Sequence, residues 1–184
     1  SRSGEHFCPL LCIVMSTLKV NEIQDTSGNV RRGIQTYAII SDEKANNTNG
    51  GTFTSGDWRT RDLNNEVTDP DGIVSVASNQ FTLGAGSYFI EGSGPAIECN
   101  RHQVRLYDVT NSAVVEYGTA EFSWNNNGYA ATRSFVSARV VISGNTTYEL
   151  QHRCQSTKSS FGMGLPANFG GVEVFSVVKI YKEA

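Results

Sequence analysis

The sequence has few charged side chains and no excess of basic ones. Lysine and arginine number 15 against 18 aspartate and glutamate residues in 184, a formal net charge of −3. The chain therefore lacks the positive field that binding to a nucleic-acid backbone requires. It also has no apolar run near the roughly 20 residues needed to cross a bilayer as a helix. We expect no nucleic-acid partner and no membrane insertion.

Cysteine and histidine are scarce as well, with four and three residues. Cys8, Cys12, Cys99 and Cys154 do not have the paired spacing of a zinc site, and we expect no cofactor. Spacing alone leaves a Cys99–Cys154 disulfide open. Free thiols are the preferred interpretation, because a core of this size does not need a covalent cross-link.

Recognisable catalytic motifs are absent. No serine or cysteine lies in a nucleophile motif, and the glycine-rich turns lack the strand-to-helix context of a phosphate-binding loop. Nothing selects a catalytic pair among the available carboxylates, which include Glu91, Glu98, Glu116 and Glu121. We therefore expect a protein that is not an enzyme.

What the sequence does contain is the alternation of apolar and polar residues in short runs, separated by glycine, asparagine and aspartate. The predicted strands are 34–40, 52–63, 73–83, 87–96, 102–109, 114–122, 133–142, 146–153 and 172–181. Many short strands joined by turns are typical of an antiparallel sandwich. The predicted fold is an all-β jelly-roll β-sandwich of about ten strands.

The first 33 residues differ from the rest. Residues 1–14 hold a short apolar stretch ahead of Met15, and we interpret them as a leader or vector-derived segment. Residues 15–33 are mostly polar and are predicted to form an N-terminal arm. The jelly-roll domain is expected at residues 34–184.

The predicted last strand, residues 172–181, is apolar on both faces. Phe175, Val177 and Tyr181 share one face, and Val178 and Ile180 share the other. A sandwich strand of a monomer usually exposes one polar face, so the second apolar face predicts burial against another subunit. Cover by the N-terminal arm of the same chain is the alternative.

The strand predicted at residues 133–142 has a similar second face. Val136, Ala138 and Val140 form an expected core face, while Phe135 and Arg139 point the other way. Arginine beside an aromatic residue is common at subunit interfaces. Phe135 and Arg139 therefore join the predicted interface.

Two histidines are weak metal candidates. His102 and His152 each adjoin an arginine on predicted strands, and their rings would approach each other, or a threefold axis, if the strands were neighbours. Hydrogen-bonded structural histidines are the preferred interpretation.

The segment from Ser123 to Tyr129 is the best ligand-binding candidate. It places Trp124 and Tyr129 on either side of three asparagines, Asn125, Asn126 and Asn127. A stacking ring beside planar amides suits a sugar. The asparagines could equally form a turn while Trp124 closes the end of the sandwich.

Several segments resemble known families. Asn79–Ile90, an apolar strand, a glycine turn and an aromatic strand, is similar to complement-globular-head and tumour-necrosis-factor-like jelly rolls, as is the closing segment Asn168–Tyr181. More specifically, the chain resembles C-terminal modules of marine phage structural and tail-fibre proteins, in segments 61–64, 100–107 and 150–154, and cyanophage proteins in its opening segment, 16–28.

This resemblance implies a homotrimer with the C-terminal strand near the axis, in a virion or extracellular setting. The expected function is that of a phage structural protein whose trimeric head attaches to a host surface, such as a cell-surface glycan, or to another virion component. No catalytic residues come with the resemblance. The alternative is a carbohydrate-binding, lectin-like module of cellular origin.

Overall fold

The computed structural model describes residues 23–24, 30–31, 36–124 and 128–183. The chain divides into two compact units, residues 1–33 and 34–184. In the first unit, β1 (Ile23–Gln24) pairs antiparallel with β2 (Val30–Arg31). The segment interpreted as a leader, residues 1–14, lies outside the described residues.

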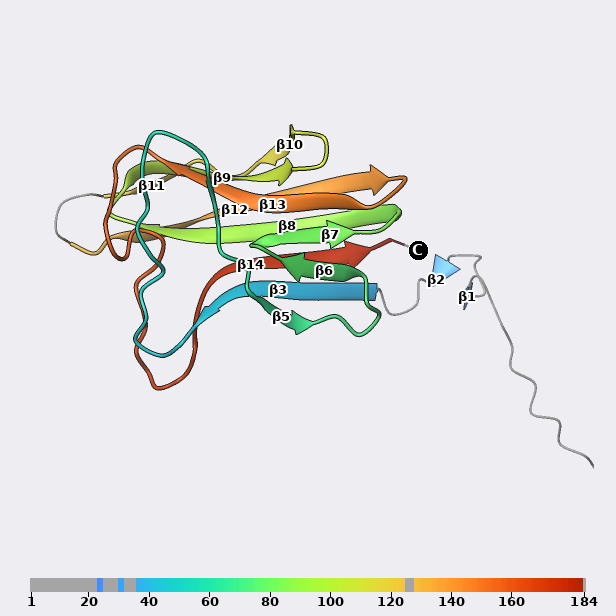
Figure 1. The fold of residues 1–184 in the computed structure, drawn as a ribbon, viewed down its shortest axis with the longest axis horizontal. Coiled ribbons are helices and arrows are strands. Elements are labelled where there is room, and N and C mark those ends of the chain that lie inside the picture. Colours follow the sequence, from blue (N-terminus) through green and yellow to red (C-terminus); the bar gives the residue numbers. More distant parts are fainter. Residues whose placement is uncertain (1–22, 25–29, 32–35, 125–127, 184) are drawn as a thin grey trace, which may run out of the picture. The chain divides into compact units, whose positions relative to one another are not determined.

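The second unit is a sandwich of two antiparallel sheets, which confirms the predicted all-β jelly-roll class (Figure 1). The five-stranded sheet has the order β12 (Ala131–Ile142), β8 (Gly86–Ile97), β14 (Glu173–Lys182), β3 (Thr36–Lys44) and β5 (Asn65–Thr68). The path through the seven-stranded sheet is β10 (Ala113–Tyr117), β9 (Asn100–Asp108), β13 (Thr146–Cys154), β7 (Gln80–Leu83) and β6 (Val74–Ala77). Two short strands complete it, β11 (Glu121–Ser123) beside β9 and β4 (Arg59–Thr60) beside β13. Among the described residues there is no helix that could cross a membrane.

The core lies between the two sheets and follows the predicted alternation. On β12, the even-numbered Val136, Ala138 and Val140 are buried, and on β9 so are Val104 and Leu106. The residues between them face outward or are half-buried. The period of two in the sequence therefore assigned the inner faces of these strands correctly.

Two predicted strands are divided in the structure. The segment 73–83 turns back on itself at Ser78 and Asn79, which both have positive φ, so β6 and β7 form a hairpin with a two-residue loop. The segment 114–122 is broken at Gly118, where a Cβ would lie 2.4 Å from the carbonyl oxygen of Phe135. β10 and β11 therefore pair separately with β9.

The segment 52–63 is mostly loop. Its apolar Phe53 is fully buried, but it makes only an isolated bridge to Lys158, and regular pairing begins at β4. This loop and the one after β13 are joined by backbone hydrogen bonds, among them Gly50 N–H to Gly164 O at 2.8 Å and Met163 N–H to Gly51 O at 3.0 Å. Together they close one end of the sandwich (Figure 1).

The prediction that Phe175 shares an outer face with Val177 and Tyr181 is wrong. A β-bulge between Val174 and Val177 inserts one extra residue opposite β3, so the alternation of β14 changes phase there. Phe175 points inward and is 4% exposed, covered by its own chain, while Val174 is 46% exposed. The close approach of Gly164 makes this burial possible, because a Cβ there would lie 2.1 Å from the Phe175 ring.

A buried guanidinium joins the two layers at the closed end. Arg61 is 0% exposed and donates hydrogen bonds to Ser176 Oγ at 2.7 Å, to Met163 O at 2.7 Å and to Pro95 O at 3.3 Å. Burial lowers its pKa to about 10, against the opposing charges of Asp42 and Asp62, so it stays protonated at neutral pH. The bulge of β14 places Ser176 inside, where Arg61 reaches it.

The two buried histidines, His102 of β9 and His152 of β13, lie side by side near the same closed end. His102 Nδ1 is 3.0 Å from His152 Nε2, and His102 Nε2 is 2.7 Å from Thr132 Oγ1. Burial lowers the pKa of His102 to about 4. Burial also lowers the pKa of His152 well below its ordinary value, with Arg61, His102 and Arg133 acting in the same direction. Both rings are therefore neutral at neutral pH.

Replacing Arg61 tests its role as a link between the layers. Arg61→Met removes the donor of three hydrogen bonds and leaves the buried Ser176 Oγ and two part-buried carbonyl oxygens without it. We expect the free energy of unfolding to fall by about 3–5 kcal/mol, measured by urea denaturation. Arg59→Met, two residues away and half-buried, should cost less than about 1 kcal/mol. Equal losses in the two variants would contradict the assignment.

The histidine pair predicts a loss of stability on mild acidification. The folded-state pKa values lie below the unfolded value of about 6.5, so the unfolded chain takes up protons first as the pH falls. Between pH 7 and pH 5 we expect the free energy of unfolding to fall by about 2 kcal/mol for each histidine. His102→Gln should remove about half of this dependence in urea titrations at the two pH values. An unchanged dependence in that variant would exclude His102 as its source.

Candidate functional site

The outward face of the five-stranded sheet carries the predicted interface residues in cross-strand rows. In one row Phe135 of β12 lies opposite Ser93 of β8, which lies opposite Val177 of β14. Because directly opposed side chains share a face, Phe135 and Val177 point to the same side with only the small Ser93 between them. They form the apolar end of this face.

A second row, four residues further along β12, is aromatic. Arg139, Phe89, Tyr181 and Tyr37 lie opposite one another in that order across β12, β8, β14 and β3. The Phe89 and Tyr181 ring centroids are 6.4 Å apart. Arg139 forms an ion pair with Glu183 at 2.7 Å, and that pair raises the pKa of Arg139. Three exposed or half-buried rings therefore lie together on one sheet.

The row between these two is polar but balanced in charge. Glu91 of β8 lies directly opposite Lys179 of β14, with Ser137 on one side and Ile39 on the other. Cross-strand neighbours of opposite sign attract each other. The face thus alternates between apolar, charge-balanced and aromatic rows.

A shallow depression lies at the apolar end of this face. It has a volume of about 390 Å³ and is lined in part by Phe135, Val177 and Arg133. Arg133 donates hydrogen bonds to the carbonyl oxygen of Phe175 at 2.8 Å and to Ser93 Oγ at 3.0 Å. The carbonyl that the bulge of β14 leaves without a regular strand partner is therefore satisfied from β12.

Four of the five predicted interface residues, Phe135, Arg139, Val177 and Tyr181, lie on this face. They come from β12 and β14, which lie on either side of β8. The separate strand patterns did not show that these two strands share a face of one sheet. The fifth, Phe175, belongs to the interior, as described above.

Of the predicted sugar-binding segment, the structure describes both aromatic residues. Trp124 is 57% exposed and Tyr129 is 62% exposed, while Asn125, Asn126 and Asn127 lie outside the described residues. The buried Glu98 accepts a hydrogen bond from Tyr129 N–H at 2.7 Å and pairs with Lys158. These contacts hold the pKa of Glu98 below its ordinary range. Tyr129 also packs on Phe161, with 5.8 Å between the ring centroids.

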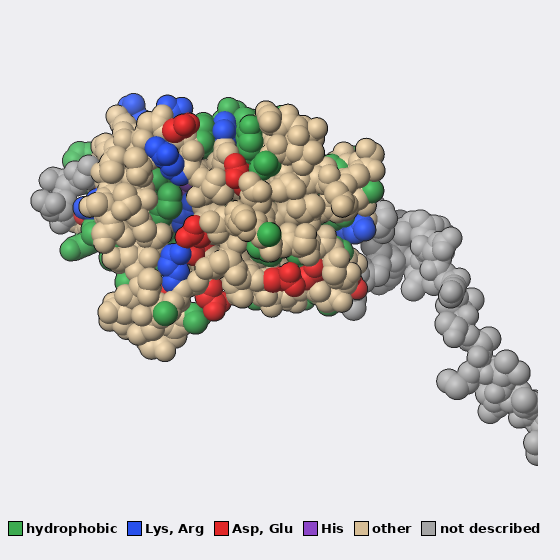
Figure 2. All heavy atoms as spheres, in the orientation of Figure 1, with side chains coloured by type: hydrophobic (Ala, Val, Ile, Leu, Met, Phe, Trp, Pro, Cys, Tyr) green, Lys and Arg blue, Asp and Glu red, His purple; other side chains and the backbone are tan. Residues whose placement is uncertain are grey.

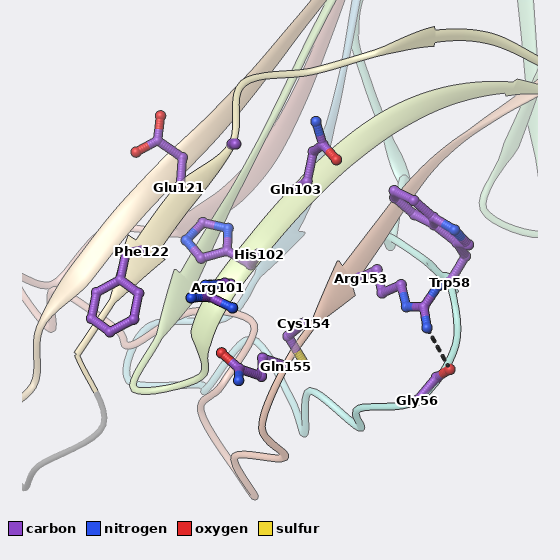
Figure 3. Close-up of a pocket in the computed structure, with 11 residues that line it drawn as sticks. Gly56, Trp58, Arg101, His102, Gln103, Glu121, Phe122, Arg153, Cys154 and Gln155 are labelled. Carbon is purple, nitrogen blue, oxygen red and sulfur yellow. Dashed lines mark hydrogen bonds between the residues drawn. The ribbon is translucent and has the colours of Figure 1, made fainter.

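A groove that sequence reasoning missed runs over the outer face of the seven-stranded sheet, where β9, β11 and β13 meet. Its volume is about 760 Å³. Figure 3 shows Phe122 and Trp58 at opposite sides, with Arg101, Gln155 and Arg153 between them. No motif marks it, because its residues come from four separated segments. Alternation showed only that the strand of Arg101 has a polar outer side.

The distribution of charge over the surface is uneven. Figure 2, in the view of Figure 1, shows lysine and arginine side chains gathered at the end of the sandwich that carries β11. The largest group of aspartate and glutamate side chains lies away from that end. Some acidic side chains lie among the basic ones there (Figure 2).

The weak metal candidates do come together, as the ring contact between His102 and His152 shows. Within the described residues, however, no group of three or more histidine, cysteine, aspartate or glutamate side chains could hold a metal ion. The pair instead packs against Phe53, whose ring centroid is 4.6 Å from that of His152. Both ring nitrogens of His102 have partners, whereas the buried Nδ1 of His152 has no hydrogen-bond partner among the described residues.

Cys99 and Cys154 are both buried and free. They belong to a small second core with Phe53 and Ala96. The hydrogen bond with Cys154, together with burial, raises the pKa of the Cys99 thiol. A thiol that stays protonated and buried is a poor nucleophile and serves as a small core residue here.

Comparison with known proteins addresses the fold. No protein-family model and no curated protein matches the chain. Eiger TNF from S. frugiperda superposes with a TM-score of 0.55 at 11% identity, covering 82% of this chain and 93% of that one. Murine APRIL at pH 8.0 gives 0.51 at 6% identity, over 81% of this chain and 99% of that one. The globular domain of zebrafish complement 1qA protein gives 0.46 at 12%, over 80% and 96%. The chain has a jelly-roll fold like that of Eiger TNF and murine APRIL.

Proposed function

We propose that the chain is a non-enzymatic attachment module that works as a homotrimer, built through the outward face of the five-stranded sheet. The observation that carries this proposal is the aromatic row of Phe89, Tyr181 and Tyr37, together with the apolar pair Phe135 and Val177, on a single sheet face. Apolar and aromatic side chains gathered on one exposed sheet face, even with a charge-balanced row between them, are typical of an interaction site.

The opposite sheet provides the comparison within the same molecule. Its outward rows pair Thr82 with Thr147 through their hydroxyl groups at 2.8 Å, and Arg105 with Gln151 at 2.6 Å. Such a face is stable in water. The seven-stranded sheet also exposes rings at its β10–β11 side, such as Tyr117 and Phe122, but its central outward rows are polar where those of the five-stranded sheet are apolar or aromatic.

Self-association fits this face better than contact with a charged partner. Around a threefold axis the same residues of three chains approach one another, and a single-sign charge would repel itself. Here Glu91 lies opposite Lys179 and Arg139 pairs with Glu183. Arg133 donates its hydrogen bonds within its own chain, and most of the other large side chains are apolar or aromatic. The sequence resemblance to trimeric jelly rolls supports the same arrangement.

We place the module in a virion or extracellular setting, as the phage-associated structural protein to which its segments are similar. Its partners would be two further copies of the chain and a host surface or another virion component. The exposed loops at the closed end are available for that attachment, with Trp124 and Tyr129 among them.

A lectin-like module of cellular origin is the second candidate. It is favoured by Trp124 and Tyr129, whose rings are more than half exposed, and by the packing of Trp124 on Phe122 at 5.7 Å. An exposed ring of this kind can stack on a sugar.

Introducing a negative charge on the outward face of the five-stranded sheet tests the trimer. The wild-type protein should have a mass of three times 20.0 kDa by light scattering at micromolar concentration. Phe135→Asp and Tyr181→Asp should each yield a folded monomer, because association would bury a carboxylate without a partner. Circular dichroism checks the fold of each variant.

The control is Tyr117→Asp on β10 of the seven-stranded sheet. Tyr117 is 53% exposed and Phe135 is 54% exposed, so the two changes alter water-exposed rings equally. Tyr117→Asp should leave the mass unchanged. A wild-type mass of 20.0 kDa, or dissociation by the control as well, would contradict the proposed interface.

The lectin alternative makes its own prediction. Trp124→Ala should abolish binding to a neutral glycan on an array, since stacking on that ring would supply most of the contact. Because Trp124 is exposed, its loss should change the free energy of unfolding by less than about 1 kcal/mol. An array without any neutral-glycan signal for the wild-type protein would remove this candidate.

A further inference from the structure

We propose that the groove over β9, β11 and β13 binds an acidic saccharide, a sugar chain that carries carboxylate or sulfate groups. This inference rests on the attachment role proposed above and identifies the ligand class and the residues that would hold it. The groove lies on the outer face of the seven-stranded sheet, away from the sheet face assigned to subunit contact.

The walls of the groove are aromatic. Phe122 of β11 lies directly opposite Arg101 of β9, so both point outward from the sheet, and Phe122 is 46% exposed. Trp58 forms the other wall (Figure 3). Its ring is 4.1 Å from the guanidinium carbon of Arg105, which itself donates to Gln151 at 2.6 Å. Trp58 is therefore held in place before a ligand arrives.

Two guanidinium groups lie between these walls. Arg153 donates one hydrogen bond to Gly56 O at 3.3 Å, which ties it to the loop of Trp58 and leaves its other donors free. Arg101 is exposed, and its guanidinium has no hydrogen bond or ion pair with any other described residue. An arginine fork matches the geometry of a carboxylate or a sulfate, and Arg101 is available for one.

Amide groups complete the lining. Gln103 lies opposite Arg153 and donates to Gly118 O at 2.8 Å, which fixes the orientation of its amide and leaves the amide oxygen as an acceptor. Gln155 is exposed, and its backbone N–H donates to Arg101 O at 2.8 Å. Planar amides hydrogen-bond hydroxyl groups in both directions, as sugar recognition requires.

The local charge favours an anion. Arg101 and Arg153 line the groove, and Glu121 is its one lining carboxylate. Glu121 lies opposite His102 in the β9–β11 pair, so it alternates away from Phe122 and Arg101. A net positive groove on a chain of charge −3 concentrates anions at that place.

A peptide is a poorer fit than a saccharide. Extended peptides bind sheets by adding a strand to a free edge. Here β9 is already paired with β11 on one side and β13 on the other, so its backbone groups are occupied. Recognition must come from side chains, and the side chains present are rings, amides and guanidinium groups. The volume of about 760 Å³ lies within the usual range for small-molecule sites.

Calorimetry with three hexasaccharides tests the proposal. The probes are a heparin-derived chain that carries sulfates, an oligogalacturonate that carries only carboxylates, and neutral cellohexaose. We expect at least one acidic chain to bind at least tenfold more tightly than cellohexaose, and its affinity to fall as salt is raised from 50 to 300 mM. The two acidic probes show which anion the groove prefers.

Variants locate the binding. Arg101→Gln and Arg153→Gln should each weaken the acidic probe about tenfold, and Phe122→Ala should weaken it several-fold through lost stacking. Lys182→Gln is the matched control, because it removes one positive charge at the end of β14 in the other sheet and should change affinity less than twofold. All four positions are at least partly exposed, so the variants should fold.

The outcomes separate this proposal from the trimer. Light scattering on the same samples reports assembly, and calorimetry reports the groove. A trimer that binds no acidic probe, equal affinity for cellohexaose, or equal losses in Arg101→Gln and Lys182→Gln would each overturn the groove assignment. A monomer that binds the acidic probe with loss only in the groove variants would support the groove and contradict the proposed assembly.

Discussion

The buried guanidinium of Arg61 organises the end of the sandwich where the structure departs most from simple alternation. A charged group in the interior is stable only when its donors are satisfied, and here the acceptors come from two strands of the five-stranded sheet and from a closing loop. Ser176 reaches Arg61 only because β14 bulges, and the same bulge turns Phe175 inward. The register of the last strand and the packing of the closed end are therefore coupled.

That closed end also supports the surface features. Arg133 satisfies the carbonyl oxygen of Phe175 and lines the depression beside Phe135, so the bulge connects the interior with the open face of the five-stranded sheet. On the other side of the sandwich, the buried His102 and Cys154 line the groove together with the exposed Arg101 and Arg153. The polar interior at this end therefore contacts two outward surfaces, the apolar face of the five-stranded sheet and the groove with its two arginines.

Much of the fold could be predicted from the sequence, because strand position and inner face depend on local alternation. The buried face of β12 was assigned correctly for this reason. Features set by backbone conformation were missed. The Ser78–Asn79 turn has no glycine to announce it, and the bulge of β14 has no signal in a run of apolar residues. The error at Phe175 followed directly from assuming unbroken alternation.

The candidate sites also differ in whether local alternation could predict them. The predicted interface residues other than Phe175 share one outward face, as expected from the alternation within each strand. The groove was not predicted, because its residues are far apart in the sequence. Trp58 reaches the groove because β4 pairs with β13, and Phe122 reaches it because β11 pairs with β9. Long-range strand pairing carries that information, and no short segment of the sequence contains it.

The placement of the groove and the open face on different sheets has a consequence for binding strength. In the proposed trimer, built through the five-stranded sheet, each seven-stranded sheet would face outward and three grooves would be displayed at fixed spacing. A polymer with repeated anionic units can then occupy more than one groove at a time, and the second contact forms at high effective concentration. Individually weak contacts would then bind the trimer to a surface that carries the anionic polymer. Rising salt would weaken each contact, and the trimer would dissociate as the contacts are lost one after another.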